Sequence, residues 1–371
     1  MTPPRAPAPH ATGSAAPRVL LLADSLGGGT GNIVLDISKR WAPEQCAARI
    51  LTQAPPTARV RPGVPVECLP PLGALGFYPV AQLRRLAQVA RRVRQLRPDV
   101  LHCYFFWSIM YGRALKALGL VPRLVENRED QGFNWGRHEY ALLRRTAGQP
   151  DLVVCVSEAV RRTVLEREGL PPERVVVIHN GIEPGPRPRT RVRDVRNAEL
   201  RRAWNIADDQ PVVGMVANFN RAVKGVGYFF DAMPAIAQAV PEVRFLLLGR
   251  GPEEAALRAR ARELGVEAHV IFAGFQEEIG SFYDMMDLSV LTSLSEGLSM
   301  TLLESMQHGV AVVATAVGGN PELVREGETG YLVPPRDVPA FADRVVALLR
   351  DPARRAAFGA AGRRVVEEEF D

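Results

Sequence analysis

Short apolar runs rich in Val and Leu alternate with amphipathic segments along nearly the whole chain, and this alternation constrains the fold more than any other feature. Runs that are apolar throughout are typical of strands buried on both faces of a parallel sheet. They span residues 18–23, 99–103, 123–126, 151–156, 175–178, 212–216, 243–248, 270–273, 288–291 and 311–314. The amphipathic segments include residues 82–96, 226–239, 253–264 and 338–349. The pattern predicts an α/β protein with parallel sheets covered by helices on both faces.

The alternation is interrupted once, at residues 183–201. This stretch has three prolines, many charges and no apolar face, so we expect a linker or an exposed crossover there. It separates two predicted Rossmann-like domains, residues 18–190 and 191–371, which we expect to face each other across a cleft. Residues 1–17 are rich in Pro and Ala, and we expect a disordered leader.

The composition excludes several classes of protein. Of the 371 residues, 47% are hydrophobic and 23% are charged, which excludes a disordered or collagen-like chain. The four cysteines form no CxxC pair, so neither a zinc ribbon nor a disulfide framework is expected, and a reducing compartment is favoured. No apolar run approaches the roughly 18 residues of a membrane-spanning helix, and the N-terminus has no signal-peptide core. We therefore expect a cytoplasmic protein.

The two halves of the chain carry opposite charge. Residues 1–200 hold 29 Lys and Arg against 17 Asp and Glu, a net +12, whereas residues 201–371 hold 17 against 24, a net −7. Opposite charges favour different partners for the two domains, one of them anionic. Nucleic acid is not the expected partner, because no helix-turn-helix, zinc finger or aromatic RNA platform is recognisable.

The densest group of polar candidates is SLSEGLSMTLLE, residues 293–304. Glu296 and Glu304 lie eight residues apart, so one helical face would not hold them together. We expect Glu296 in a loop, Ser299 as the N-cap of a helix, and Glu304 in its second turn. The first N–H groups of that helix would bind an anion such as a phosphate, and the carboxylates would accept bonds from sugar hydroxyls. The alternative is that neither residue has a function, with Glu296 in a loop and Glu304 facing solvent on the helix.

The region that continues from this motif resembles the donor-binding segment of the family 4 glycosyltransferases, which are retaining enzymes of the GT-B fold. It reads SEGLSMTLLESMQHGVAVVATAVGGNPELVREGETGYLVPPRD. Further matching pieces follow the family order over nearly the whole chain: VLLLADSLGGGTGN, VCVSEAV, VIHNGIEP, VVGMVANFNRAVKG, LLLGRGPEE and VIFAGF. The resemblance implies an acceptor-binding N-terminal domain, a donor-binding C-terminal domain, and transfer of a sugar from a nucleotide diphosphate to an acceptor hydroxyl of a glycan, glycolipid or lipid-linked sugar.

The resemblance assigns roles to residues of the second domain. Arg221 and Lys224 would neutralise the donor diphosphate, Glu296 would hold the transferred sugar, and Glu304 would hold the ribose. The remaining donor contacts would come from Gly297, Leu298, Ser299, Gly249, Gly251, Phe275, Gly28 and Gly29, the last two in the first domain. Phe275 would flank the base, with a place in the core as the alternative.

One residue of this set also stands out by composition. The chain has 43 Arg but only Lys39, Lys116 and Lys224, so a lysine beside Arg221 indicates a need for a compact point charge. The alternative is an ordinary exposed pair on a loop.

Residues 126–133, ENREDQGF, depart from the family pattern, in which many relatives carry a histidine near the end of this strand. Arg128 and Asp130 match a subgroup with a Ser-Arg-x-Asp-x-Gly-Phe sequence. They are therefore candidates, together with His138, for contacts with the sugar or the acceptor. His102 is a further alternative, although a single histidine on a strand is more often structural.

No metal and no cofactor are expected besides the nucleotide-sugar co-substrate, because no Asp-x-Asp pair is present and Arg221, Lys224 and a helix N-terminus can carry the charge. We expect substitution with retention, in which the acceptor proton passes to a departing phosphate oxygen. The rivals are another GT-B activity, such as a sugar-nucleotide epimerase or a phosphorylase, and a nucleotide-sugar binder without turnover. The phosphorylase is disfavoured because no cofactor lysine site is recognisable.

The first domain also has a candidate membrane surface. The apolar loop 70–79 precedes a basic helix with apolar residues on one face, a combination typical of peripheral contact with anionic lipid, here at the inner face of the membrane. A surface helix whose apolar face packs on its own sheet is the equally weighted alternative.

Overall fold

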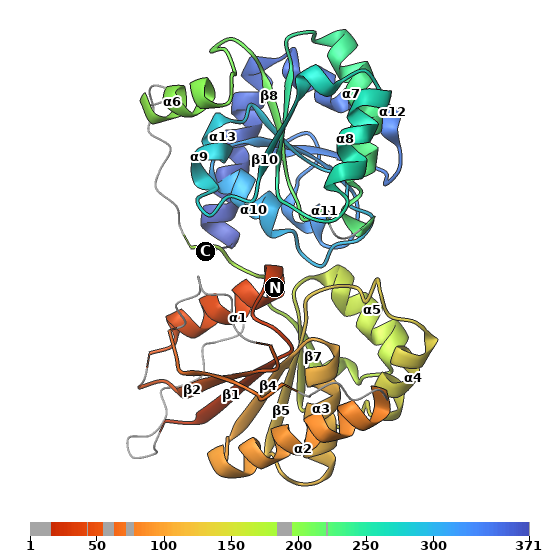
Figure 1. Ribbon diagram of the computed structural model, residues 1–371. Coiled ribbons are helices and arrows are strands. Elements are labelled where there is room, and N and C mark those ends of the chain that lie inside the picture. The colour runs from red at the N-terminus through yellow and green to blue at the C-terminus, as the bar shows by residue number, and fades with distance from the viewer. Residues whose placement is uncertain are drawn as a thin grey trace. The chain divides into compact units, whose positions relative to one another are not determined.

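The computed structural model describes residues 16–42, 44–54, 63–71, 78–183, 195–219 and 222–370 (Figure 1). The chain divides into two compact units. The first comprises Met1–Arg128, His138–Val154 and Glu168–Val176, and the second comprises Glu129–Arg137, Cys155–Arg167 and Val177–Asp371. The predicted boundary at residue 190 and the leader up to residue 15 lie outside the described residues.

A seven-stranded sheet forms the centre of the first unit, in the order β3-β2-β1-β4-β5-β6-β7. The pairings of β1 with β2 and β4, of β2 with β3 and of β4 with β5 are parallel. The strands are β1 (Arg18–Ala23), β2 (Ala47–Thr52), β3 (Val66–Cys68), β4 (Val100–Tyr104), β5 (Arg123–Arg128), β6 (Leu152–Cys155) and β7 (Val175–Val177). The helices of this part of the chain are α1 (Gly28–Arg40), α2 (Tyr78–Leu96), α3 (Phe106–Ala117), α4 (Arg137–Arg145) and α5 (Glu158–Glu168), with the 3-10 turn η1 (Pro172–Arg174).

The second unit contains a six-stranded sheet, in the order β10-β9-β8-β11-β12-β13. All five pairings are parallel. The strands are β8 (Val212–Val216), β9 (Arg244–Leu248), β10 (Val270–Gly274), β11 (Leu288–Leu291), β12 (Ala311–Thr315) and β13 (Gly330–Val333). The helices are α6 (Val195–Ala203), α7 (Val226–Ala239), α8 (Glu254–Glu263), α9 (Gly280–Met285), α10 (Met300–Gln307), α11 (Asn320–Leu323), α12 (Val338–Leu349) and α13 (Pro352–Glu369), with the 3-10 turns η2 (Ala222–Lys224) and η3 (Glu267–His269).

Strand β9 shows why its sequence has no polar alternation. Phe245 and Leu247 belong to a core cluster with α7, α8 and α12, whereas Leu246 and Leu248 belong to a second cluster with α9. Successive side chains of a strand point to opposite faces, so a strand covered by helices on both sides needs apolar residues at every position. The expected α/β architecture with two covered parallel sheets is confirmed.

Every strand predicted from an apolar run is present, with ends shifted by no more than two residues. Three strands were missed. β2 reads AARILT and exposes Arg49, β3 has only three residues, and β13 begins at Gly330. These strands are short or carry weak strand-forming residues, so their sequences give little signal.

The predicted linker is wrong over its last residues, because α6 begins at Val195 within it. Arg201 is fully buried and donates hydrogen bonds to the carbonyl oxygens of Met285, Ala207 and Gln210. Leu200 packs against the cluster that contains α9. The sequence did not predict the burial of Arg201, because residue type alone does not distinguish a guanidinium bonded to buried carbonyl oxygens from a solvated one. Residues 184–194 lie outside the described part of the chain.

In the described part of the chain, no helix combines the length and the apolar character needed to cross a bilayer.

Candidate functional site

The strand order of the second unit reverses direction between β8 and β11, which is where ligands bind in open parallel sheets. Lys224 follows β8 in η2, and Glu296 lies in the loop after β11. The Lys224 Nζ donates to Glu296 Oε1 at 2.8 Å and to Oε2 at 3.0 Å. The fold thus brings together two residues that the sequence analysis assigned to one site.

The loops that carry this pair are tied to each other. Leu294 N donates to Val223 O at 2.7 Å, and Thr292 Oγ1 donates to Gly225 O at 2.8 Å. A Cβ on Gly225 would lie 2.0 Å from the Thr292 carbonyl oxygen, so only glycine permits this approach. The separation of the two charged groups is therefore fixed by backbone contacts.

The Glu296 carboxylate, in a residue that is only 8% exposed, has a second donor that sequence reasoning missed. Ser293 Oγ donates to Glu296 Oε1 at 2.6 Å, and Thr315 Oγ1 at the end of β12 donates to the Ser293 carbonyl oxygen at 2.6 Å. Serine is common in loops, so the only available signal was its position directly after a strand, three residues before Glu296.

Helix α10 begins as predicted. Ser299 is its N-cap, and the Ser299 hydroxyl accepts a hydrogen bond from Leu302 N. The other N–H groups of the first turn have no earlier helical carbonyl to bond, which makes this end of the helix attractive to anions. Glu304 lies in the second turn, where Tyr283 donates its hydroxyl hydrogen to Glu304 Oε2 at 2.7 Å. Burial raises the pKa of Glu304, while the bond from Tyr283 and the nearby His308 lower it.

The backbone around Gly297 and Leu298 is closely packed. Leu298 is 6% exposed, and the Gly297 carbonyl oxygen accepts a bond from Gly319 N at 2.9 Å. A Cβ on Gly318 would lie 1.8 Å from the Glu296 carbonyl oxygen. The sequence analysis gave Gly318 and Gly319 no role of their own. The structure shows that they allow the Glu296 loop to pack against the segment after β12.

The turn after β9 supplies further predicted residues. Gly249 has φ +141°, and a Cβ there would lie 1.8 Å from the Ala217 carbonyl oxygen. Gly251 accepts a bond from Glu254 N at 3.1 Å near the start of α8. Phe275 follows β10 and is 49% exposed, with the Arg250 guanidinium 4.9 Å from its ring centroid. Phe275 therefore does not take the place in the core that was its alternative.

Arg221, which the sequence analysis assigned to this site, lies outside the residues that the structure describes.

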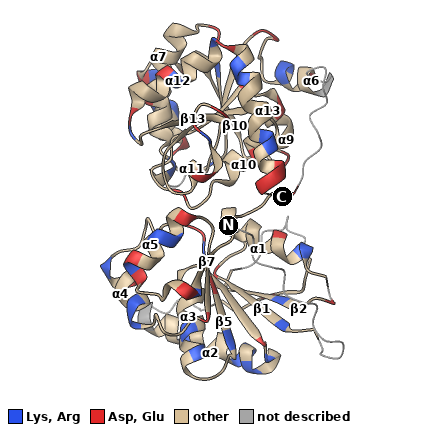
Figure 2. Cartoon of the chain, turned by 180° about the vertical axis from the view of Figure 1, so that it is seen from behind, with Lys and Arg blue, Asp and Glu red and all other residues tan. Residues whose placement is uncertain are grey.

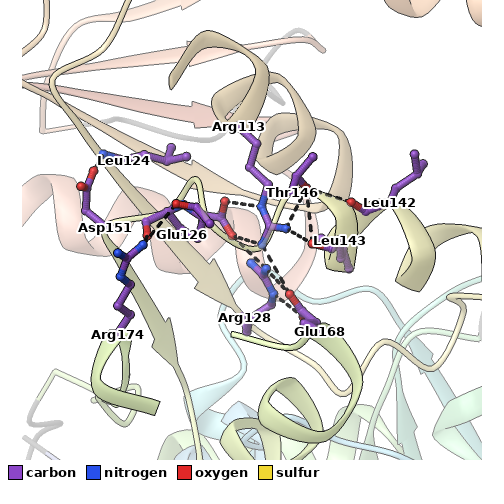
Figure 3. A network of polar contacts seen from close by, with 12 residues as sticks. Arg113, Leu124, Glu126, Arg128, Leu142, Leu143, Thr146, Asp151, Glu168 and Arg174 are labelled. Atoms are coloured by element: carbon purple, nitrogen blue, oxygen red, sulfur yellow. Dashed lines mark hydrogen bonds and ion pairs between the residues drawn. The ribbon is translucent and has the colours of Figure 1, made fainter. Parts of the chain in front are cut away.

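Arg128 occupies a different setting from the expected one. It belongs to a buried network with Arg113, Glu126 and Glu168, drawn in Figure 3. Arg128 Nε and Nη2 donate to the two oxygens of Glu168 at 2.9 and 2.7 Å. Arg113 Nε and Nη2 donate to the two oxygens of Glu126 at 2.7 and 2.8 Å, and Arg128 Nη2 donates to Glu126 Oε2 at 2.9 Å. Since Arg128 is 2% exposed and satisfied by two carboxylates, its position corrects the expectation of a direct contact with sugar.

Of the other candidates, His102 and His138 belong to the first unit, whereas Asp130 belongs to the second. Asp130 is exposed and accepts a bond from Gly132 N at 2.7 Å, and His138 is exposed on α4. His102 lies on β4 with Nε2 3.2 Å from Asn127 Oδ1, and burial lowers its pKa to about 4. A neutral, half-buried histidine fits the structural alternative better than a catalytic role.

Gly28 and Gly29 lie in the first turn of α1. Gly28 has φ +75°, and Cβ atoms on Gly28 or Gly29 would meet no atom within 4 Å. Asp24, which sequence reasoning missed, directly follows β1. Asp24 Oδ1 accepts bonds from Ser108 N at 3.0 Å and Ser108 Oγ at 2.5 Å, and it thereby caps α3. Burial raises the pKa of Asp24.

Helices α2 and α4 carry many of the basic residues of the first half of the chain (blue in Figure 2). On α2, Val89 and Val93 are fully buried, so the apolar face packs on its own domain. Arg85 is also buried and donates to Pro70 O at 3.0 Å. The exposed residues of this segment include Leu83, Arg84, Arg91, Arg94 and Arg97. Much of the predicted loop 70–79 lies outside the described residues.

Within the described ranges, no group of three or more His, Cys, Asp or Glu is arranged to hold a metal ion. The Lys224–Glu296 pair and the N-terminus of α10 together can bind an anion beside sugar hydroxyls.

Comparison with known proteins gives matches over both halves of the chain. Residues 27–185 match the family model described as Glycosyltransferase Family 4, and residues 210–351 match the model described as Glycosyl transferases group 1. A GDP-mannose-dependent alpha-(1-6)-phosphatidylinositol monomannoside mannosyltransferase of Mycobacterium tuberculosis is 30% identical over 282 residues, covering 71% of this chain and 72% of the relative. The N-acetyl-alpha-D-glucosaminyl L-malate synthase of Bacillus anthracis is 29% identical over 307 residues, covering 79% and 75%.

Solved structures resemble this chain over nearly all of its length. HepE of Anabaena in complex with UDP-glucose has a TM-score of 0.82 at 23% identity and covers 96% of both chains. The sucrose-phosphate synthase of Thermosynechococcus elongatus has a TM-score of 0.82 at 20% identity and covers 95% of both chains. At these identities the likeness shows a shared fold.

Proposed function

The chain belongs to glycosyltransferase family 4, the group 1 glycosyltransferases of the GT-B fold, and we propose that it transfers a sugar from a nucleotide diphosphate to an acceptor hydroxyl with retention of configuration. The observation that carries this proposal is the Lys224–Glu296 pair at the switch point of the second sheet. The names of two relatives refer to transfer or synthesis with GDP-mannose and with an N-acetylglucosaminyl group, which supports a nucleotide-sugar donor.

The donor diphosphate would lie between Lys224 and the N-terminus of α10. A negative ligand there draws Lys224 Nζ toward its oxygens, and the Glu296 carboxylate becomes available to the hydroxyls of the transferred sugar. Arg221, three residues before Lys224, would add a second cation. Glu304 would accept bonds from the ribose hydroxyls, and Phe275 beside Arg250 would flank the base.

Retention follows if the acceptor oxygen approaches the anomeric carbon from the face that the diphosphate leaves. The bond from that carbon to the phosphate oxygen breaks as the new glycosidic bond forms, and the acceptor proton passes to the departing oxygen. Lys224 and the α10 N-terminus would stabilise the negative charge that grows on the diphosphate. Because protein groups supply this charge, we propose that the reaction needs no metal and no further cofactor.

The acceptor would bind to the first domain, in keeping with the basic charge of that half of the chain. We propose a glycan, glycolipid or lipid-linked sugar as the acceptor, and a location in the cytoplasm, with contact to the inner membrane face through Leu83 and the exposed arginines of α2. Absence of binding to vesicles of anionic lipid at low salt, compared with neutral vesicles, would remove the membrane part of this proposal.

A binding test separates the proposal from its rivals. GDP-mannose, UDP-glucose, UDP-N-acetylglucosamine, an ADP-sugar and a dTDP-sugar are added with EDTA to the wild type, to Lys224→Ala and to Lys39→Ala, and thermal unfolding is followed. At ~100 times its dissociation constant a ligand stabilises the fold by about 2.7 kcal/mol. One donor class should stabilise the wild type and Lys39→Ala but not Lys224→Ala. No stabilisation by any donor contradicts the proposal, and a donor that binds but is never turned over with any acceptor favours the binding-protein rival.

A further inference from the structure

The described contacts of Glu304 are asymmetric. Its Oε2 atom accepts the hydroxyl hydrogen of Tyr283 at 2.7 Å, whereas the described residues give its Oε1 atom no hydrogen-bond partner. Figure 1 shows the short helix α9, which carries Tyr283, beside α10, which carries Glu304. One oxygen of the carboxylate is thus held by the protein, and the other remains for a ligand.

The Tyr283 side chain is itself fixed. The residue is 1% exposed, and its ring stacks on His308 with centroids 5.5 Å apart and an angle of 28° between the rings. His308 is held in turn, since its Nδ1 lies 2.7 Å from Asp284 Oδ1. A tyrosine ring packed in this way points its hydroxyl in one direction, so the bond to Glu304 limits the rotation of the carboxylate.

We propose that Tyr283 is a positioning residue for donor recognition: it holds Glu304 in the orientation in which the second carboxylate oxygen accepts hydrogen bonds from the ribose hydroxyls. This inference rests on the proposed function, because it requires a nucleotide in the site. Helix α9 would thereby contribute to discrimination between ribonucleotides and deoxynucleotides. Tyr283 is buried and would act through Glu304, without touching the ligand.

The bond also acts on the charge of Glu304. Burial raises the pKa of this carboxyl, and the hydrogen bond from Tyr283 opposes that shift. The titratable groups that act on Glu304 are Tyr283 and His308, and His308 is paired with Asp284. An ionised carboxylate accepts stronger hydrogen bonds than a neutral acid, so Tyr283 helps to keep Glu304 in its better accepting form near neutral pH.

The test compares a nucleotide with and without ribose hydroxyls. Dissociation constants of UDP and of GDP, each with its 2′,3′-dideoxy counterpart, are measured for the wild type, Tyr283→Phe and Tyr331→Phe. Tyr331 is the matched control, because it lies on β13 and its hydroxyl bonds Arg354 Nη1 rather than Glu304. The wild type and Tyr331→Phe should prefer the ribonucleotide by roughly 10- to 100-fold, and Tyr283→Phe should reduce this preference to a few-fold. The affinity of Tyr283→Phe for the dideoxynucleotide should stay within about 2-fold of the wild type.

A pH series gives a readout that a purely structural tyrosine would not move. Below the pKa of Glu304 the ribose preference should fade, and in Tyr283→Phe it should fade at a higher pH than in the wild type. An equal loss of affinity for both nucleotides, or an unchanged ribose preference in Tyr283→Phe, overturns the inference while leaving the proposed function intact. If neither UDP nor GDP binds the wild type, the inference is wrong, whereas the proposed function fails only if the ADP- and dTDP-sugars also leave thermal unfolding unchanged.

A second pair of variants covers the case in which Tyr283→Phe does not fold. The pair consists of Glu304→Gln and the double variant Tyr283→Phe/Glu304→Gln. Both replace the buried carboxylate by a neutral amide, so loss of the Tyr283 hydroxyl leaves no buried charge without a hydrogen bond. Once the carboxylate is gone, removal of the Tyr283 hydroxyl should change the ribose preference by less than about 2-fold. A further large loss on adding Tyr283→Phe to Glu304→Gln would show that Tyr283 acts on the nucleotide by another route, and the inference would be wrong.

Discussion

The ammonium nitrogen of Lys224 lies 2.8 Å from one carboxylate oxygen of Glu296 and 3.0 Å from the other, across a sequence separation of 72 residues. The two side chains neutralise each other at the switch point of the second sheet. In the proposed function, a diphosphate that enters this site would meet a cation whose partner can turn to the sugar. The pair would then link donor binding to the chemistry proposed for Glu296.

Replacement of Lys224 by methionine keeps the length of the side chain and removes its charge. We expect kcat/KM for the nucleotide-sugar donor to fall by roughly 10²- to 10³-fold, because the leaving diphosphate loses a charged partner. Steady-state kinetics with the donor found in the binding screen give the measurement. Lys39→Met is the control, since Lys39 pairs with Asp36 on the surface and should keep wild-type kinetics. Wild-type activity of Lys224→Met would remove this residue from the reaction.

Gly249→Ala tests the close approach of the turn after β9 to the loop after β8. The new methyl group would lie 1.8 Å from the Ala217 carbonyl oxygen, so the backbone must move and the free energy of unfolding should fall by more than about 2 kcal/mol. Gly265→Ala is the control, because Gly265 also has positive φ, +69°, but open space around it, and should cost only about 1 kcal/mol. Urea denaturation measures both. Equal losses would mean that the clash relaxes without cost.

The pKa of His102, lowered to about 4 by burial, predicts a dependence of stability on pH. The unfolded chain takes up a proton at pH ~6.5, before the folded protein does. The stability associated with neutral His102 is therefore complete above pH ~6.5 and is lost as the pH falls toward 4, by at most about 3 kcal/mol. His102→Gln should flatten this part of the stability profile in denaturant titrations from pH 7 to 4.5. His138→Gln, on the exposed surface of α4, should leave the profile as in the wild type; the same flattening in both variants would contradict the assignment.

The buried network around Arg113 should act on stability rather than on catalysis. Arg113→Met removes the guanidinium that holds both oxygens of Glu126 and leaves Arg128 as the one cation of the described network against two buried carboxylates. The uncompensated negative charge should cost about 3–5 kcal/mol of unfolding free energy. Arg18→Met, which breaks an exposed pair with Asp99, should cost no more than about 1 kcal/mol. Thermal unfolding compares the two. The KM for the donor of any folded Arg113→Met protein should equal that of the wild type, and a selective rise in KM would instead point to a role in substrate binding.

Much of the fold follows from local sequence. The apolar runs at β1, β8 and β11 were predicted with the ends that the structure has, because strands covered on both faces must be apolar at every position. Helix α10 and its cap at Ser299 were also predictable, since capping is a contact between neighbours in sequence. Strand β3, with three residues, and strand β13, which begins with glycine, carry too weak a signal.

The candidate site could be predicted only as a set of residue types. The match to a family motif identifies Arg128 as a candidate. It does not indicate that Glu126 and Glu168 bind its guanidinium. In the same way the sequence contains Tyr283 and Ser293 without indicating that they donate to Glu304 and Glu296. Glu168 lies 40 residues from Arg128 in the sequence, and Glu304 lies 21 residues from Tyr283.

The sequence by itself determined the alternation of strands and helices, the two parallel sheets, the family and the residue types of the candidate site. Each of these depends on side-chain polarity, on steric preference or on contacts within one turn of chain. Only the tertiary structure decided which charges neutralise each other, which carboxylates are held by a hydroxyl, and which arginine is buried. The physical reason is that pairing energies depend on distance and burial, and both are set by how sheets and helices pack segments that the sequence keeps apart.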